Sequence, residues 1–160
     1  MDPTLLLRGK YTFRSAGRKL ILVKKPVESV RHVVMKALLW ALYRPCYPEI
    51  AVEVPIGGKY KPDLVQTGPQ GPVFWGEAGT VSTAKLRRIL KRFSRTHFAL
   101  AAWGGQLSVR ETRIRRELRG ISRAAPVDII RFSTDADGRF VATDGTIGIS
   151  HDDVDWLRID

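Results

Sequence analysis

The hydrophobic pattern changes its period twice between residues 73 and 103, and this change limits the folds that the chain can adopt. Residues 73–77, VFWGE, are apolar enough to form a central strand of a sheet. Residues 80–93 then place apolar side chains on one face of a helix, and residues 97–103, HFALAAW, are typical of a buried strand. Strands and helices in this order predict an α/β fold, in which helices flank a mixed central sheet.

The segment before this region predicts a helix followed by a hairpin. In residues 26–43, apolar side chains that include Val27 recur at helical spacing. In residues 50–56, larger apolar side chains occupy every second position, which is typical of a strand with one buried face. The glycine pair at 57–58 suits a tight hairpin turn, and we expect residues 60–65 to form the return strand.

The rest of the chain predicts short strands and one further helix. The expected elements are strands at 11–13, 19–23 and 127–132, and a basic helix at 107–119 that ends at Gly120. The pairs Asp137-Gly138 and Asp144-Gly145 predict turns between short strands, so we expect a C-terminal β extension. The 160 residues fit a single domain, with a core at about 26–103 and an additional helix and strands at 104–160.

The chain is strongly basic, which bears on its partners. Its 27 Lys and Arg residues exceed its 16 Asp and Glu residues, and the net charge is +11. The excess is concentrated in residues 85–123, whereas residues 133–160 are acidic. A concentrated positive segment predicts binding to a polyanion, nucleic acid first, although solvated helix faces produce the same pattern.

Cysteine content and hydropathy indicate the compartment. Cys46 is the only cysteine, so no intramolecular disulfide can form, and this favours a reducing compartment. The sequence shows no signal peptide and no apolar stretch long enough for a bilayer, so we expect a soluble, cytoplasmic protein without a membrane partner. The histidines match no metal-ligand spacing, and the simplest role of His32 is a hydrogen bond to Glu28, one helical turn earlier.

Two acidic residues, Asp63 and Glu77, stand on consecutive expected strands that a turn joins. If they pair near the same end of this hairpin, both carboxylates point at one place. Two carboxylates, a backbone carbonyl and water suit Mg²⁺ or Mn²⁺, which can polarise a phosphodiester and lower the pKa of a bound water. Lys85, at the border of the apolar stripe of the next helix, can reach the same place and stabilise charge on phosphorus. Glu28, at the start of the first helix, is a candidate third carboxylate.

Four short motifs, in this order, resemble those of a known family. They are ESVRHVVMKALLWALY at 28–43, KPDLV at 61–65, WGEAG at 75–79 and KLRR at 85–88. They are similar to motifs of the YaeQ-like family of uncharacterised bacterial proteins, and the order of elements resembles the core of the PD-(D/E)XK nuclease superfamily. The resemblance covers 26–103 and implies a restriction-endonuclease-like core with the order αβββαβ. It also implies a metal site at Asp63 and Glu77, with Glu28 as the helix carboxylate.

One position departs from the superfamily pattern. That pattern has a lysine two residues after the second acid, where this chain has Gly79. YaeQ-like proteins also have glycine there, and other superfamily members recruit a lysine from the next helix. Lys85 is therefore the candidate for this role. Arg88 is the second choice, because a guanidinium cannot give up a proton at working pH.

The leading hypothesis is a metal-dependent phosphodiesterase or nuclease that acts on DNA or RNA with Mg²⁺ or Mn²⁺. The residues assigned to it are Asp63, Glu77 and the Ala78 carbonyl for the metal, Asp63, Glu77, Lys85 and Glu28 for catalysis, and Lys61, Arg88 and Arg92 for the nucleic acid. The main alternative is a non-catalytic protein that keeps the nuclease-like scaffold and binds nucleic acid or a protein partner through its basic surface. A third possibility is an interaction domain whose acidic tail pairs with its own basic helices or with another copy.

Structural roles also account for these residues, without a catalytic or metal-binding function. Asp63 is common beside turns, and an ion pair between Glu77 and Lys85 would satisfy a buried acid. Glu53 alternates with two valines, so we expect it to face solvent or the far side of its strand and rank it as an alternative ligand. The SHDD sequence at 150–153 could bind a cation, but a capped helical turn is the simpler interpretation.

Overall fold

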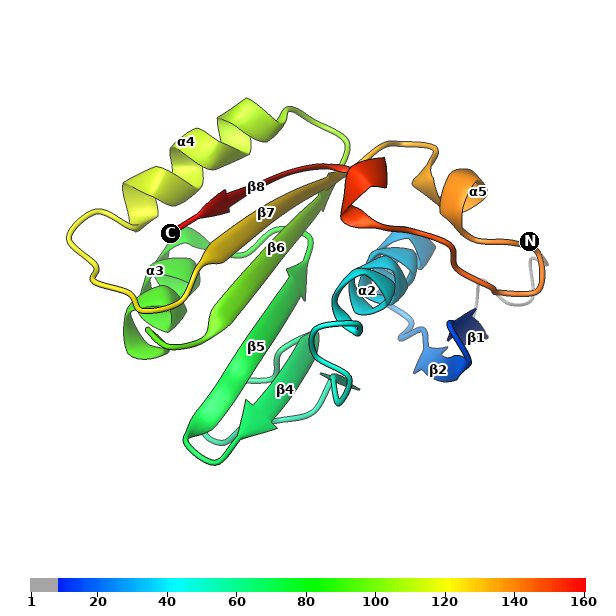
Figure 1. Ribbon diagram of the computed structural model, residues 1–160, viewed down its shortest axis with the longest axis horizontal. Coiled ribbons are helices and arrows are strands. Elements are labelled where there is room, and N and C mark those ends of the chain that lie inside the picture. Colours follow the sequence, from blue (N-terminus) through cyan, green and yellow to red (C-terminus); the bar gives the residue numbers. More distant parts are fainter. Residues whose placement is uncertain (1–8) are drawn as a thin grey trace.

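The computed structural model describes residues 9–160 and contains a six-stranded sheet and a separate two-stranded sheet (Figure 1). The strand order in the large sheet is β3-β4-β5-β6-β7-β8. Its strands are β3 (Ala51–Val52), β4 (Leu64–Gly68), β5 (Gly71–Ala78), β6 (His97–Trp103), β7 (Val127–Phe132) and β8 (Asp155–Ile159). β5, β6 and β7 run parallel, and the other neighbouring pairs are antiparallel. The prediction of a mixed central sheet is therefore confirmed.

Helices cover both faces of this sheet (Figure 1). α2 (Val30–Tyr43) packs on one face, and α3 (Thr83–Arg92) and α4 (Leu107–Glu117) pack on the other. Side chains of β5 alternate between the two layers, since Phe74 packs with α2 and Trp75 packs with α3. The predicted helices and strands of this central region are thus present.

α2 is buried on every side, and it starts later than expected. All of its residues from 33 to 43 are buried between the large sheet and the two-stranded sheet. The helix begins after Ser29 rather than at Pro26, because Ser29 is its N-cap and accepts a hydrogen bond from the His32 N–H at 3.1 Å. Val27 is therefore 96% exposed instead of part of the buried stripe. No helix within residues 9–160 combines the length and hydrophobicity needed to cross a membrane.

The hairpin expected over residues 50–65 takes a different form. β3 is only two residues long, because Glu53 has a positive φ of 56°, which lies outside the extended region. The glycine pair at 57–58 turns the chain inside a loop rather than between paired strands. Regular pairing with β3 resumes at Leu64, so the return strand starts there instead of at residue 60.

The C-terminal region contains a short helix that was not expected. α5 (Ala136–Phe140) occupies the place where Asp137-Gly138 was predicted to join two strands, and that prediction is wrong. A helix forms because its first and last residues, one turn apart, are both buried against α2. The capped helical turn expected at 150–153 is present as η1 (His151–Asp153), and β8 then extends the sheet beside β7.

The two-stranded sheet packs against the turn after α5. β1 (Lys10–Ser15) and β2 (Arg18–Val23) are antiparallel, as predicted. The N–H of Arg14 donates to the carbonyl of Gly145 at 2.9 Å. A Cβ atom on Gly145 would lie 2.1 Å from the carbonyl oxygen of Thr12, so glycine is needed for this close approach.

Candidate active site

The register of β4 and β5 brings the two predicted acids together. Leu64 pairs with Gly76 in this antiparallel pair. Asp63 directly precedes Leu64 and Glu77 directly follows Gly76, so the two acids meet at this end of the pair, where their side chains are hydrogen-bonded to each other. The N–H of Ala78 donates to Oδ2 of Asp63 at 2.9 Å, which holds the aspartate against the end of β5.

The pKa values of the two carboxyl groups are shifted in opposite directions. Burial and the negative charge of Asp63 raise the pKa of Glu77 from its ordinary 4.5 to about 7, although the indole N–H of Trp75 donates to its Oε1 at 2.9 Å. Burial also opposes the ionisation of Asp63, but hydrogen bonds from His32 and from the Ala78 N–H outweigh it and lower the pKa of Asp63. Near neutral pH, Glu77 is therefore a partly protonated group hydrogen-bonded to an ionised aspartate.

His32 connects this acid pair to a second group of charges. Its Nε2 lies 3.4 Å from Oδ2 of Asp63, and its Nδ1 lies 2.5 Å from Oε2 of Glu28. Hydrogen bonding to Asp63 raises the pKa of His32 against the opposing effect of burial. The bond expected between Glu28 and His32 is present. Glu28 itself precedes the N-cap of α2 rather than lying in its first turn, and it reaches the acid pair through the imidazole.

Lys36 belongs to this site, and the sequence pattern did not identify it. Its side chain is 0% exposed, and its Nζ lies 2.5 Å from Oε2 of Glu28 and 2.5 Å from Oε1 of Glu53. Burial disfavours its charge, but hydrogen bonds to these two carboxylates outweigh burial and raise the pKa of Lys36. The available signal was a lysine inside an apolar helix, since a buried charge needs a partner.

Glu53 does not face solvent or the far side, so that expectation is wrong. The side chain is 24% exposed and is paired with Lys36. The expectation assumed a regular strand through 50–56, and the positive φ of Glu53 interrupts that alternation. Glu53 therefore ends a chain of charges that runs through α2 to the acid pair.

Lys85 reaches the acid pair from the other layer. Its Nζ lies 3.6 Å from Oε1 of Glu77, and its side chain is 40% exposed. The start of α3 is held by Ser82, whose hydroxyl accepts a hydrogen bond from the Lys85 N–H at 3.3 Å. This arrangement puts an amine beside the carboxylates, and it also neutralises Glu77 without any ligand.

Gly79 has a backbone conformation that disfavours the lysine of the superfamily pattern. Its φ is 95°, in the region that side-chain-bearing residues rarely adopt. Its N–H donates to the carbonyl of Ala101 at 2.9 Å, so the chain leaves β5 in a defined turn. A lysine at this position would be strained, and Lys85 supplies an amine from the next helix instead.

The donor atoms of the acid pair suit a hard divalent cation. Mg²⁺ commonly binds through one or two carboxylates and keeps several waters, and Asp63 and Glu77 offer two carboxylates at one place. Within residues 9–160, no group of three or more His, Cys, Asp or Glu side chains is placed to hold a metal ion. The fit of a cation thus depends on the acid pair together with oxygen ligands such as the Ala78 carbonyl and water.

The residues predicted to contact nucleic acid have different surroundings. Lys61 and Arg88 are exposed, and Arg88 lines a hollow of about 280 Å³ together with Lys85. The guanidinium carbon of Arg92 lies 5.4 Å from the ring centre of Tyr60, which holds this side chain by a cation–π contact. Other arginines of the basic segment are used in packing. Arg87, Arg113 and Arg123 donate to main-chain carbonyls of neighbouring elements.

A second buried polar cluster surrounds Asp128 in β7. Its Oδ2 accepts hydrogen bonds from the Tyr43 hydroxyl and from Nε2 of His97, each at 2.7 Å. Its Oδ1 accepts from Nε of Arg158 at 2.8 Å. Burial opposes the charge of Asp128, but these hydrogen bonds outweigh it and lower the pKa to about 2. The cluster joins α2, β6, β7 and β8, and sequence spacing showed no sign of it.

Comparisons with known proteins identify the fold. No family model matches the sequence, and no curated protein sequence matches it. The YaeQ protein from Pseudomonas syringae has a solved structure that aligns with a TM-score of 0.53 and 15% sequence identity, over 76% of this chain and 72% of that chain. The YaeQ protein from Xanthomonas axonopodis pv. citri aligns with a TM-score of 0.55 and 16% identity, over 88% and 84%. The chain has the fold of YaeQ proteins. In this YaeQ-like fold, the acid pair lies at the carboxyl end of β5, where the sheet meets α2 and α3.

Proposed function

We propose that the chain belongs to the YaeQ-like family of the PD-(D/E)XK superfamily and is a cytoplasmic, Mg²⁺- or Mn²⁺-dependent phosphodiesterase acting on DNA or RNA. The observation that carries this proposal is the pairing of Asp63 with Glu77 in a buried place, where burial and then the charge of Asp63 raise the pKa of Glu77 to about 7. Two carboxylates that repel each other in a buried place are stabilised by a shared divalent cation. The fold of this chain supports the proposal because the four motifs lie at α2, β4, β5 and α3, in the order that the resemblance implies.

The residues of the site have distinct roles in this proposal. Asp63 and Glu77 hold the cation, and the Ala78 carbonyl is a further ligand. A divalent cation bound there supplies polarisation of the phosphodiester and a lowered pKa for a bound water. His32, held by Glu28 at 2.5 Å, keeps Asp63 ionised and oriented.

Lys85 takes the role of the lysine that Gly79 replaces. Its Nζ, 3.6 Å from Oε1 of Glu77, orients the attacking water and stabilises the charge that develops on phosphorus. Lys61, Arg88 and Arg92 bind phosphates that flank the cleaved bond. Such contacts make the affinity for nucleic acid fall with salt, with a log–log slope of about −0.9 per neutralised phosphate of a duplex.

The test compares wild type with Asp63→Asn and with Asp152→Asn. Asparagine at 63 keeps an oxygen for the Ala78 N–H but loses the charge, and Asp152 is an exposed carboxylate of η1 that serves as the control. Titration calorimetry with Mn²⁺ should show binding to wild type and to the control, and greatly weakened binding to Asp63→Asn. The same three proteins are then incubated with labelled DNA and RNA in Mn²⁺. Equal cleavage by all three contradicts the assignment of this site.

A non-catalytic scaffold that binds nucleic acid is the second candidate. It is favoured by Gly79 and by the ion pairs already present, since Lys36 pairs with Glu28 and Glu53, and Lys85 lies 3.6 Å from Glu77. Binding of nucleic acid by a wild-type protein that takes up no Mn²⁺ at millimolar concentration supports this candidate over the enzyme.

A further inference from the structure

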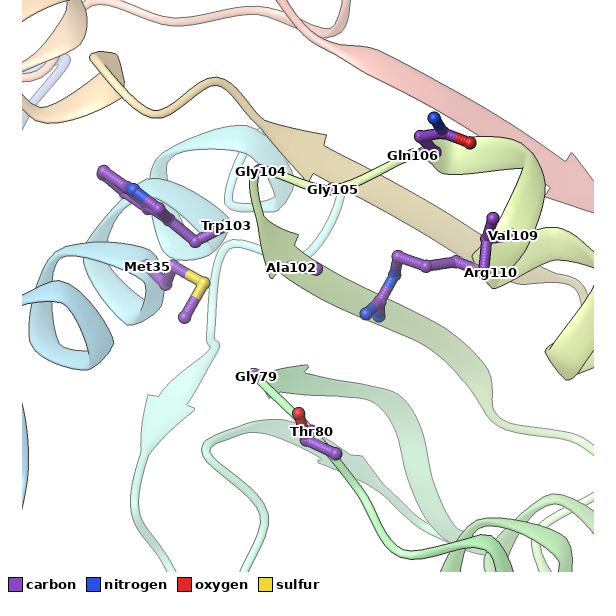
Figure 2. A pocket seen from close by; sticks show the side chains of 10 residues that line it. All are labelled: Met35, Gly79, Thr80, Ala102, Trp103, Gly104, Gly105, Gln106, Val109 and Arg110. Atoms are coloured by element: carbon purple, nitrogen blue, oxygen red, sulfur yellow. The ribbon is translucent and has the colours of Figure 1, made fainter.

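A pocket of about 430 Å³ lies beside the acid pair, between the ends of β5 and β6 and the start of α4 (Figure 2). Gly79 and Thr80, which directly follow β5, line one side, and the glycine pair at 104–105 lines another. Because Gly79 is two residues from Glu77, the pocket adjoins the proposed catalytic centre. Figure 2 shows the Arg110 side chain extending from α4 toward the space above Thr80.

Arg110 is the charged residue among those that line this pocket. Its Nε is buried and has no hydrogen-bond partner in the part of the chain that the structure describes. None of the residues that line the pocket carries a carboxylate. Burial, and then the nearby charge of Arg113, lower the pKa of Arg110. Because a guanidinium nevertheless stays protonated in proteins, this position favours an anion.

The other donors around the pocket favour the same class of ligand. Gln106, the N-cap of α4, makes no side-chain capping bond, so the first-turn amides of this helix remain available as donors. Gly104 and Gly105 have φ values of 68° and 70° and bring main chain without side chains to the pocket. The N–H of Gly104 donates to the carbonyl of Phe132 at 2.7 Å, so the glycine donor for a ligand is the N–H of Gly105. Phosphate oxygens match this set, since a guanidinium binds them through two parallel hydrogen bonds.

We propose that this pocket binds a phosphate group of the nucleic-acid backbone, next to the bond that the acid pair cleaves, with Arg110 as its main anchor. The identity of the substrate rests on the proposed function, whereas the anion site rests on the pocket itself. The carboxylates of Asp63 and Glu77 repel a phosphate until a cation is bound. The pocket, which carries the opposite charge, holds the substrate strand independently of the metal.

The direct test uses inorganic phosphate as the probe, in EDTA. Heteronuclear NMR of isotopically labelled protein follows the Nε–H of Arg110 and the amides of Gly104 and Gly105. We expect these three signals to shift together with phosphate in wild type. In Arg110→Met the Nε–H signal is absent, which identifies it, and the two glycine amides should stay in place when phosphate is added. Wild-type signals that do not move, or amide shifts that persist in Arg110→Met, overturn the proposal.

A second test measures binding of a short fluorescein-labelled single-stranded DNA by anisotropy in EDTA, where no metal-dependent cleavage occurs. Arg110→Met should weaken binding about tenfold, because it removes a charge-assisted contact from a half-buried side chain. Arg116→Met removes the same charge from an exposed position of the same helix, and it should change the affinity less than about twofold. Equal losses in the two variants show an effect of net charge alone and overturn the proposal.

The two proposals fail in distinguishable ways. If wild type cleaves no nucleic acid but Arg110→Met still weakens binding selectively, the phosphate pocket stands and the phosphodiesterase does not. If Asp63→Asn loses cleavage while Arg110→Met binds DNA as wild type does, the phosphodiesterase stands and the pocket does not.

Discussion

Replacing Glu77 with glutamine should stabilise the protein above neutral pH and leave its stability almost unchanged in acid. The pKa of Glu77 is raised from its ordinary 4.5 to about 7, so the unfolded state releases this proton at a lower pH than the folded state does. Below pH 4.5 the group is protonated in both states, and no penalty exists. Above pH 7 it is ionised in both states, and the folded state bears the full penalty of a second buried negative charge beside Asp63.

The size of this effect follows from the pKa difference. A rise from 4.5 to about 7 corresponds to a penalty of about 3 kcal/mol in the free energy of unfolding. Glutamine removes the charge but keeps the hydrogen bonds, because its oxygen can accept from Trp75 and its amide can donate to Asp63. For a chain of this length, about 3 kcal/mol corresponds to a rise of roughly 10 °C in the melting temperature.

The assay is urea denaturation followed by tryptophan fluorescence, above pH 7 and near pH 4.5. Glu111→Gln is the control, because Glu111 forms a helical ion pair with Arg115 at 2.8 Å, and its loss should cost about 0.5 kcal/mol or less. Added Mn²⁺ should stabilise wild type above pH 7 and stabilise Glu77→Gln much less, since the amide cannot provide the second charge. A Glu77→Gln protein that is less stable than wild type at both pH values refutes the reasoning.

Three further changes test other parts of the structure. Gly79→Ala should destabilise the fold by about 1 kcal/mol or more in urea denaturation, because the φ of 95° is strained for alanine. Crowding adds little, since Cε of Met35 lies 3.9 Å from the position of the added carbon. Unchanged stability contradicts this prediction. Lys36→Met should lower the free energy of unfolding by roughly 3–5 kcal/mol, because Glu28 and Glu53 lose their buried counter-ion. A variant more stable than wild type would show that the two carboxylates do not need this counter-ion. Asp128→Asn should lower the free energy of unfolding by about 2 kcal/mol at neutral pH, because the lowered pKa of Asp128 stabilises the fold above pH 3.8. This contribution is lost as the pH falls through about 2. A difference in stability between wild type and variant that does not shrink in acid argues against this origin.

Predictions that depended on strong local patterns agree with the structure. The apolar runs at 73–77 and 97–103 are strands of the sheet, and the one-sided stripe after Ser82 is a helix that this serine caps. In such segments burial, periodicity and capping all favour the same element. The start of α2 was placed too early because Pro26 and Ser29 are both acceptable near a helix start, and only the side-chain bond of Ser29 marks the boundary.

The candidate site was predictable in part for a similar reason. Asp63 and Glu77 could be placed near each other because each lies near the end of a strand that a turn joins. Their exact register also depends on an irregularity between Gln66 and Thr67, which shifts the pairing by one residue. Lys36 and Glu53 could not be paired in this way. Their contact joins a helix to a loop whose path depends on the positive φ of Glu53. The hydrophobic periodicity of the sequence does not reveal this backbone conformation.

By itself, the sequence determined the alternation of strand and helix, the mixed α/β class and the two acids at the edge of one hairpin, because these follow from side-chain period and turn chemistry over a few residues. Tertiary structure alone decided which charges meet. It placed Lys36 between Glu28 and Glu53, set His32 against Asp63 and left the Nε of Arg110 unpaired among residues 9–160, beside a pocket. The physical reason is that the energy of a buried charge depends on atoms only a few ångströms away, and in a folded chain those atoms come from elements that are distant in sequence.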